Sequence, residues 1–134
     1  MNERRPEGVP EVVKRCPIVN TFSIVGKKFS VAILRNMLYF NQTRFNQFLG
    51  SIEGINPKIL SARLREMERD GLIQRKVYVE RPVRIEYHPT EKGRAMKPIL
   101  QQMAIFSMRY CPEEVFKDGK PRTYQKVFAK LDRP

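Results

Sequence analysis

Apolar residues in the first half of the chain recur at helical spacing, in segments separated by glycine, proline and asparagine. This spacing places the apolar side chains of each segment on one face of a helix. The pattern predicts four helices, over residues 17–26, 28–40, 45–52 and 57–70.

The fourth of these segments has the clearest end signals. Asn56 is suited to cap the free N–H groups, and Pro57 fits the first helical position, where no donor is needed. Gly71 ends the helix, and Leu72 can then fold back on its last turn. The positions predicted to face inward are Leu60, Leu64 and Met67.

After Leu72 the apolar period changes from 3.6 to 2, which is typical of strands. One strand is expected from Ile73 to Val79 and a second from Val83 to His88, with residues 80–82 as the hairpin tip. Thr90 then caps a long helix that we expect to reach Tyr110 and to kink at Pro98.

This order of elements predicts an α+β fold that is mainly α. Helices, a short helix–helix connection and a hairpin are typical of a winged helix-turn-helix with a two-stranded wing. The third helix would brace the fourth, and the fourth would lie in the major groove of DNA. A long C-terminal dimerisation helix and an extra C-terminal helix complete the prediction.

The ends of the chain are expected to lie outside this domain, which we place at residues 16–110. Residues 1–15 mix charges with prolines and are predicted to be a flexible arm. Residues 111–134 are predicted to contain a turn and a short amphipathic helix that begins near Tyr124. We expect that helix to dock on the domain or across a dimer. The alternative is a basic tail that becomes ordered on DNA.

The charge of the chain favours a polyanionic partner. It has 26 Lys and Arg against 14 Asp and Glu, a formal charge of +12, with a pI near 10.1. DNA, RNA or an acidic membrane surface would fit this charge, and a merely Lys- and Arg-rich surface is the alternative. The excess lies in residues 16–112, with sixteen basic and seven acidic side chains, rather than in the ends.

The fourth helix supplies the main candidates for base contacts. Since its apolar side faces the core, an outward face remains near its N-terminal half, and that end of a recognition helix meets base edges. The alternative is a solvated face balanced by nearby acidic residues. The predicted DNA-binding residues on this helix are Asn56, Lys58, Ser61, Ala62, Arg63, Arg65 and Arg69.

Further cations are placed where they could contact the DNA backbone. Arg81 and Arg84 lie at the predicted wing and suit phosphate or minor-groove contact, and Arg75 and Lys76 lie on the incoming strand. Ordinary surface charge on an exposed hairpin is the alternative. Arg44 precedes the third helix and could bind a phosphate beside its N-terminus.

No enzymatic or metal site is predicted, and no cofactor is expected. His88 is the only histidine and is expected to be structural, and there is no phosphate-binding glycine loop or nucleophile motif. Cys16 and Cys111 are too few for a disulfide scaffold and are not spaced as metal ligands. No apolar run reaches membrane-spanning length, and no signal peptide is recognised, so a cytoplasmic protein without membrane contact is expected.

Several segments together resemble the HxlR-type transcription regulators, which lie close to the MarR group. The similarity begins at Cys16-Pro17-Ile18 and continues through residues 24–29, 33–35, 44–48, 55–61, 63–68, 70–73 and 84–87 to Thr90-Glu91-Lys92-Gly93. The family usually has Gly-Gly-Lys-Trp where this chain has Gly26-Lys27-Lys28-Phe29. The resemblance implies a dimeric winged-helix protein that binds double-stranded DNA in bacteria or archaea.

The resemblance also implies a candidate thiol. Some members of the family sense oxidants through an N-terminal cysteine, and Cys16 occupies that position. Such a cysteine needs a lowered pKa, and the neighbouring Lys14, Arg15 and the start of a helix would favour one. The alternative is a half-buried, inert side chain. An oxidant or a small molecule is therefore the candidate effector.

The apolar content of the long helix predicts a homodimer. Met96, Ile99, Leu100, Met103 and Phe106 form one stripe, and a second stripe lies beside it. We expect the second stripe and the first helix to meet a partner chain. The predicted interface residues are Ile18, Phe22, Ala104, Ile105 and Met108.

A DNA-binding transcription regulator is the function that these observations favour, with the homodimer reading a palindromic operator. A winged-helix protein-interaction module of the transcription machinery is the main alternative, followed by a non-specific chromatin-type DNA binder. Operator preference and salt dependence would distinguish the three.

Overall fold

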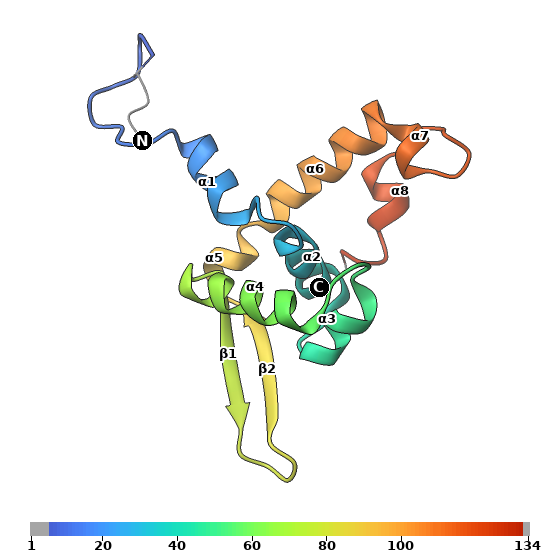
Figure 1. Ribbon diagram of the computed structural model, residues 1–134. Coiled ribbons are helices and arrows are strands. Elements are labelled where there is room, and N and C mark those ends of the chain that lie inside the picture. Colours follow the sequence, from blue (N-terminus) through green and yellow to red (C-terminus); the bar gives the residue numbers. More distant parts are fainter. Residues whose placement is uncertain (1–5, 133–134) are drawn as a thin grey trace.

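The computed structural model describes residues 6–132 as a mainly helical fold with one two-stranded antiparallel sheet (Figure 1). This arrangement confirms the predicted winged helix-turn-helix. The helices are α1 (Pro17–Val25), α2 (Ser30–Phe40), α3 (Phe45–Ser51), α4 (Pro57–Arg69), α5 (Glu91–Arg94), α6 (Lys97–Tyr110), α7 (Pro112–Val115) and α8 (Tyr124–Phe128). The strands are β1 (Ile73–Tyr78) and β2 (Arg84–Pro89).

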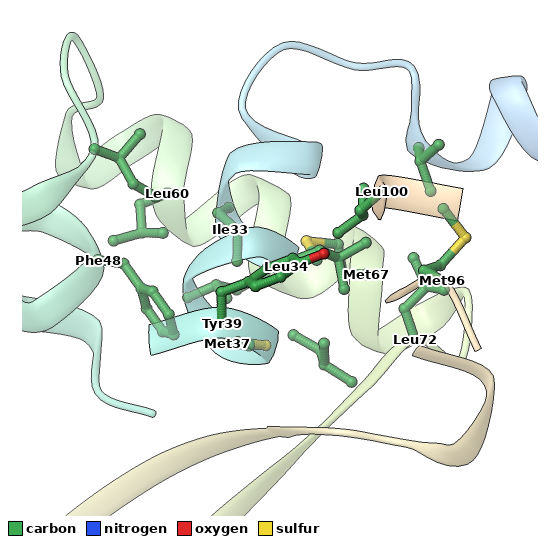
Figure 2. Packing of buried hydrophobic residues seen from close by; sticks show 14 residues of the cluster. Ile33, Leu34, Met37, Tyr39, Phe48, Leu60, Met67, Leu72, Met96 and Leu100 are labelled. Atoms are coloured by element: carbon green, nitrogen blue, oxygen red, sulfur yellow. The ribbon is translucent and has the colours of Figure 1, made fainter. Parts of the chain in front are cut away.

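The core lies between α2, α3, α4 and the start of α6. Ile33 and Leu34 of α2, Phe48 of α3 and Leu60 of α4 are each fully buried (Figure 2). Burial of such side chains contributes on the order of 2 kcal/mol each. The apolar faces that the sequence predicted for these three helices therefore meet one another.

A buried polar cluster fixes α3 against α2. The Asn36 side chain is fully buried, and its Nδ2 donates to Gln42 Oε1 and to Ser51 Oγ, both at 2.9 Å. Arg35 Nε donates to Asn36 Oδ1 at 2.9 Å. Because a buried amide without partners is costly, these bonds favour one position of α3.

The end of α4 and the start of α5 meet at a close backbone approach. Gly71 adopts a φ of +78°, and Leu72 N–H donates to Met67 O at 2.9 Å, as in a Schellman cap. Thr90 N–H donates to Leu72 O at 3.0 Å, and Thr90 Oγ1 accepts from Gly93 N–H at 3.1 Å. A side chain at Gly93 would collide with Leu72 O, so glycine is required there.

The predicted long helix from Thr90 to Tyr110 is wrong in one respect. The structure has two helices, with α5 ending at Arg94 and α6 beginning at Lys97. Pro98 lies in the first turn of α6, so it helps to start a helix where an interior kink was expected. The missing N–H of proline costs nothing at that position.

Residues 116–132, which follow α7 in the C-terminal extension, return along α6 to the core. Tyr124 of α8 contacts Tyr39 of α2 through their hydroxyls, 2.8 Å apart, and the ring centroids of Tyr39 and Phe128 lie 5.4 Å apart. Lys97 Nζ lies 3.2 Å from Asp132. These contacts agree with the predicted short helix docked on the domain, and not with a free basic tail.

The N-terminal segment forms turns before α1. Val9 N–H donates to Pro6 O at 3.3 Å, and Val13 N–H donates to Pro10 O at 3.1 Å. Residues 1–5 of the predicted arm lie outside the described residues.

Within residues 6–132 no single helix is long and apolar enough to cross a membrane. Helices α1 and α2 reach that length and apolar content only when taken together, and an 84° bend separates them.

Candidate nucleic-acid interface

Helix α4 is held so that one face points away from the molecule. Asn56 Oδ1 accepts a hydrogen bond from Ile59 N–H at 2.8 Å, which confirms the predicted cap. Leu60, Leu64 and Met67 are buried beneath the helix. The helix lies at the surface above the hairpin (Figure 1), as a recognition helix does.

The outward face of α4 is cationic. Lys58, Ala62, Arg65 and Arg69 are spaced at i, i+4, i+7 and i+11, which places them on one side of the helix. Lys58 and Arg65 are exposed, and within residues 6–132 no carboxylate lies within ion-pair distance of either. Arg69 is also exposed but lies 3.5 Å from Asp70.

A groove separates α4 from the wing. It has a volume of about 340 Å³ and is lined by Ser61, Leu64, Arg65, Glu68, Arg75 and Tyr87. Ser61 is half-buried on this side of α4, so its hydroxyl faces the groove rather than the centre of the cationic face. Arg65 and Arg75 place positive charge on both walls.

Arg63 does not lie on the outward face, contrary to the prediction. Its Nε donates to Lys28 O at 3.0 Å, and its Nη1 lies 3.3 Å from Glu66 Oε2. Its side chain is 22% exposed. Arg63 therefore connects α4 to the loop before α2 and is not available as a base contact.

The same side of α4 carries a second ion pair. Lys27 Nζ lies 3.1 Å from Glu66 Oε1. The hydrogen bond from Lys27, with the charges of Lys27 and Arg63, lowers the pKa of Glu66. At neutral pH this carboxylate is ionised and offsets two nearby cations, so this flank of α4 is less positive than the outward face.

The wing is an antiparallel pair in which Val77 lies opposite Ile85. Its tip projects away from the helices (Figure 1). Arg75, Lys76 and Arg81 are exposed along it. Val79 follows β1 and is 92% exposed, and Val77 and Ile85 are 49% and 39% exposed. The core therefore does not cover the apolar residues toward the tip of the wing.

Arg84 differs from the prediction, because its charge is offset within the wing. Its guanidinium lies 4.3 Å from the Tyr78 ring, 3.5 Å from Glu80 and 3.2 Å from Glu86. Its side chain is 33% exposed. Arg84 braces the hairpin, and Arg81 remains the cation at the tip.

Arg44 lies beside the wing at the start of α3. Its side chain is 52% exposed, and its Nη2 lies 3.9 Å from Glu86 Oε2. The hydrogen bond with His88, together with the charges of Arg84, His88 and Arg44, lowers the pKa of Glu86. Thr43 O accepts from Tyr87 N–H at 2.7 Å, which joins the loop before α3 to the wing.

Apolar side chains are exposed on the side of the molecule opposite the wing, where α1 and α6 extend (Figure 1). On α1, Ile18 is 81% and Phe22 is 70% exposed. On α6 the exposed face consists of Ile99, Met103, Phe106 and Tyr110.

The predicted face of the long helix is therefore wrong. Met108 is buried within its own chain, at 3% exposed, and Ala104 and Ile105 are half-buried. Because the chain folds back over one side of α6, Met108 is covered by its own chain, while Ile105 lines a groove beside the C-terminal extension. Helical spacing could not tell the two stripes apart, since both are apolar.

The two cysteines form no disulfide bond. Cys16 and Cys111 are both half-buried, and Cys16 immediately precedes α1. Among the described residues, no group of three or more His, Cys, Asp or Glu side chains is arranged to hold a metal ion.

The helix-turn-helix and its wing match known proteins. Residues 24–115 match the HxlR-like helix-turn-helix family. The chain belongs to this family. It is 36% identical over 95 residues to the HTH-type transcriptional regulator YdeP of Bacillus subtilis. The aligned region covers 71% of this chain and 73% of YdeP.

Two solved structures have the same fold. The redox regulator HypR in its oxidised form has a TM-score of 0.64 and 34% identity, covering 70% of this chain and 96% of HypR. The reduced form of the transcriptional regulator YodB from B. subtilis has a TM-score of 0.64 and 31% identity, covering 74% of this chain and 97% of YodB. Family and fold together make this chain a DNA-binding transcription regulator.

Proposed function

We propose that this protein regulates transcription as a homodimer that reads a palindromic operator through α4 and the wing. The observation that carries the proposal is the cationic outward face of α4, where Lys58 and Arg65 are exposed and have no carboxylate partner within residues 6–132. A regulator of this kind acts where the chromosome lies, in the cytoplasm of a bacterial or archaeal cell.

In this proposal α4 enters the major groove with its N-terminal half. Lys58 and Arg65 meet base edges, where a guanidinium binds guanine O6 and N7 well. Ala62 lies between them on the cationic face and sets how closely the helix approaches, and Ser61 contributes its hydroxyl from the groove side. Asn56 keeps its capping bond and contributes its amide nitrogen, and Arg69 meets a phosphate beyond the base contacts.

The wing and the start of α3 bind the backbone on either side. Arg75, Lys76 and Arg81 contact phosphates or the minor groove, and Arg44 contacts a phosphate beside the N-terminus of α3. These contacts orient the protein and release counterions, so they strengthen binding to all DNA sequences. Arg63 and Arg84 take no part, since their charges are offset internally.

The homodimer forms through the exposed apolar faces of α1 and α6. Phe22 and Phe106 are 70% and 62% exposed, and large aromatic side chains in water mark an interaction surface. A two-fold axis through this side would place two recognition helices about 34–36 Å apart, one turn of DNA. The operator would then be palindromic.

The proposal is tested by selecting bound fragments from random DNA and measuring fluorescence anisotropy on the selected site. Preference over bulk DNA by roughly 10³ or more at physiological salt is expected. Arg65→Ala should relax sequence preference, and Arg81→Ala should weaken all DNA more evenly. Lys117→Ala, an exposed cation of the C-terminal extension, is the matched control and should change neither.

The competing functions give different results in the same experiment. A chromatin-type protein would show steep salt dependence without sequence preference, and a protein-docking module would show no DNA binding at all. Either result would refute operator reading.

The dimer is tested separately by sedimentation. The wild type should sediment as a dimer at micromolar concentration, and Phe106→Glu should shift it to monomer because it places a charge in the apolar contact. Lys117→Glu is the control for added acidity. A wild-type monomer would contradict the proposal.

A thiol sensor is the second candidate role, and the redox regulator HypR favours it by similarity. Cys16 precedes α1, one of the two proposed dimer helices, so its oxidation could alter the dimer. The alternative remains an inert, half-buried thiol. Operator affinity should fall after mild oxidation of the wild type and not of Cys16→Ser, and unchanged affinity after oxidation confirmed by mass spectrometry would dispose of the role.

A further inference from the structure

A groove lies between α6 and the C-terminal extension, on the flank of α6 away from its exposed apolar face. Its volume is about 410 Å³, within the usual range for small-molecule sites. It is lined by Ile105, Arg109, Pro121, Arg122, Thr123 and Tyr124. Four of these residues lie beyond residues 24–115, the part that matches the family, so the groove belongs to the extension of this chain.

The walls of the groove are held in place by the protein itself. The Tyr124 ring stacks on Phe128 with centroids 4.6 Å apart, and its hydroxyl lies 2.8 Å from that of Tyr39. Arg122 makes two bonds to Asp118, at 2.7 and 2.6 Å. A ligand therefore meets a preformed site and loses less free energy to ordering.

The groove combines an apolar floor with one available positive charge. Ile105, Pro121 and the Tyr124 ring supply the apolar surface. The Arg122 charge is satisfied by Asp118, whereas no carboxylate within residues 6–132 lies within ion-pair distance of Arg109. The Arg109 guanidinium lies 5.3 Å from the Tyr110 ring, and within residues 6–132 its N–H groups donate to no other group, so they are available to a ligand.

We propose that this groove binds a small aromatic carboxylate. The ring of the ligand would lie between Ile105, Pro121 and Tyr124, and its carboxylate would accept hydrogen bonds from Arg109. A guanidinium matches a carboxylate in a planar, two-bond geometry. A neutral aromatic would lose the charged bonds, and a highly charged ligand would lose the apolar contact.

Tyr124 links the groove to the rest of the fold. It forms one wall and also bonds to Tyr39 of α2, while Ile105 and Arg109 belong to α6, the proposed dimer helix. A carboxylate bound here would contact both α6 and α8, and so affect how α6 sits on the DNA-binding helices. This effector role rests on the proposed function, whereas ligand binding does not.

Binding is tested without DNA, by isothermal titration calorimetry and by amide NMR shifts on the full chain with 2-naphthoate. A saturable site is expected, with a dissociation constant on the order of 1 mM or tighter, and with shifts at Ile105, Thr123 and Tyr124. The neutral isostere 2-naphthamide should bind roughly tenfold more weakly. Equal affinity for the two compounds, no saturation, or shifts elsewhere would each overturn the site.

Three variants and one control sharpen the result. Arg109→Gln should weaken 2-naphthoate roughly tenfold and remove its advantage over 2-naphthamide, while Arg109→Lys should keep part of that advantage. Ile105→Trp should fill the groove and abolish binding of both. The control, Lys117→Gln, removes an exposed charge of the extension that does not line the groove and should leave 2-naphthoate binding unchanged. If it weakened binding as much as Arg109→Gln, the assignment of Arg109 as the carboxylate-binding residue would be refuted.

The effector role is then measured as operator affinity with and without saturating 2-naphthoate. A change in the wild type that Ile105→Trp abolishes supports coupling, and an unchanged affinity refutes it. If the protein binds 2-naphthoate but no operator, the groove stands and the proposed function fails; if it binds an operator but not 2-naphthoate, the reverse holds.

Discussion

Two arginines that lie two positions apart on α4 should respond in opposite ways to removal. Arg63 connects α4 to the loop before α2 through its bond to Lys28 O, at 3.0 Å, and lies 3.3 Å from Glu66. Arg65 is exposed on the cationic face. We predict that Arg63→Ala lowers stability and that Arg65→Ala lowers operator affinity.

The magnitudes follow from these contacts. A hydrogen bond from a charged donor contributes about 1.5–3 kcal/mol, and a partly exposed ion pair adds well under about 1 kcal/mol. Since the Arg63 side chain is 22% exposed, solvent replaces part of the lost bonding, and we expect Arg63→Ala to cost about 1–2 kcal/mol. Arg65→Ala should change stability by less than about 0.5 kcal/mol.

The effect on DNA has the reverse order. Loss of one base contact costs about 1–3 kcal/mol, so Arg65→Ala should weaken operator binding roughly 5- to 150-fold. Arg63→Ala should leave operator affinity within about threefold of the wild type at a temperature where both are folded.

Urea denaturation followed by far-ultraviolet circular dichroism gives the stability, and fluorescence anisotropy on the selected operator gives the affinity. The reasoning would be refuted if Arg63→Ala kept full stability while losing operator affinity as Arg65→Ala does. Arg63 would then contact DNA, and the distinction between the two sides of α4 would be wrong.

Three further predictions concern stability. Tyr124→Phe should lower the free energy of unfolding by about 1–2 kcal/mol, because it leaves the hydroxyl of Tyr39, which is 5% exposed, without its partner. In urea denaturation, changing both Tyr39 and Tyr124 to Phe should lower the free energy of unfolding by less than the sum of the two single changes. Simple additivity would refute the contact. Leu60→Ala should cost about 2–5 kcal/mol by the same measurement, since Leu60 is fully buried, and a smaller loss would contradict its place in the core. The hydrogen bond from Arg122 lowers the pKa of Asp118 below its ordinary 3.8, so the ionised carboxylate stabilises the fold above pH 3.8 and this stabilisation is lost as the pH falls further. The melting temperature of the wild type should therefore exceed that of Asp118→Asn at pH 6, and the difference should shrink toward pH 2. A difference that stays constant down to pH 2 would contradict the ion pair.

Much of the fold could be predicted because its signals are local. Asn56 and Pro57 begin α4, and Gly71 ends it, since caps and proline act through the backbone within one turn. The change from helical to alternating spacing after Leu72 marked the wing for the same reason. The break at Pro98 was misplaced by a few residues, because proline is compatible both with a kink and with a first turn.

The candidate site was predicted less completely, because a cation has the same appearance in sequence whether it faces solvent or a partner. Arg63 and Arg65 differ by two positions, which turns their side chains about 200° apart around the helix axis. Arg84 is a different case, because its partners Glu80 and Glu86 lie only four and two positions away and the extended geometry of β2 places residues 84 and 86 on one face. Ion pairs between elements depend on distances that no local pattern encodes.

Sequence alone determined the order and ends of the elements, the positive charge and the family, since each of these follows from composition or from neighbours within a few residues. Tertiary structure decided which faces are covered. Met108 is buried and Phe106 is exposed because the chain returns over one side of α6, and that return brings residues together that lie tens of positions apart. The groove between α6 and the C-terminal extension exists for the same reason.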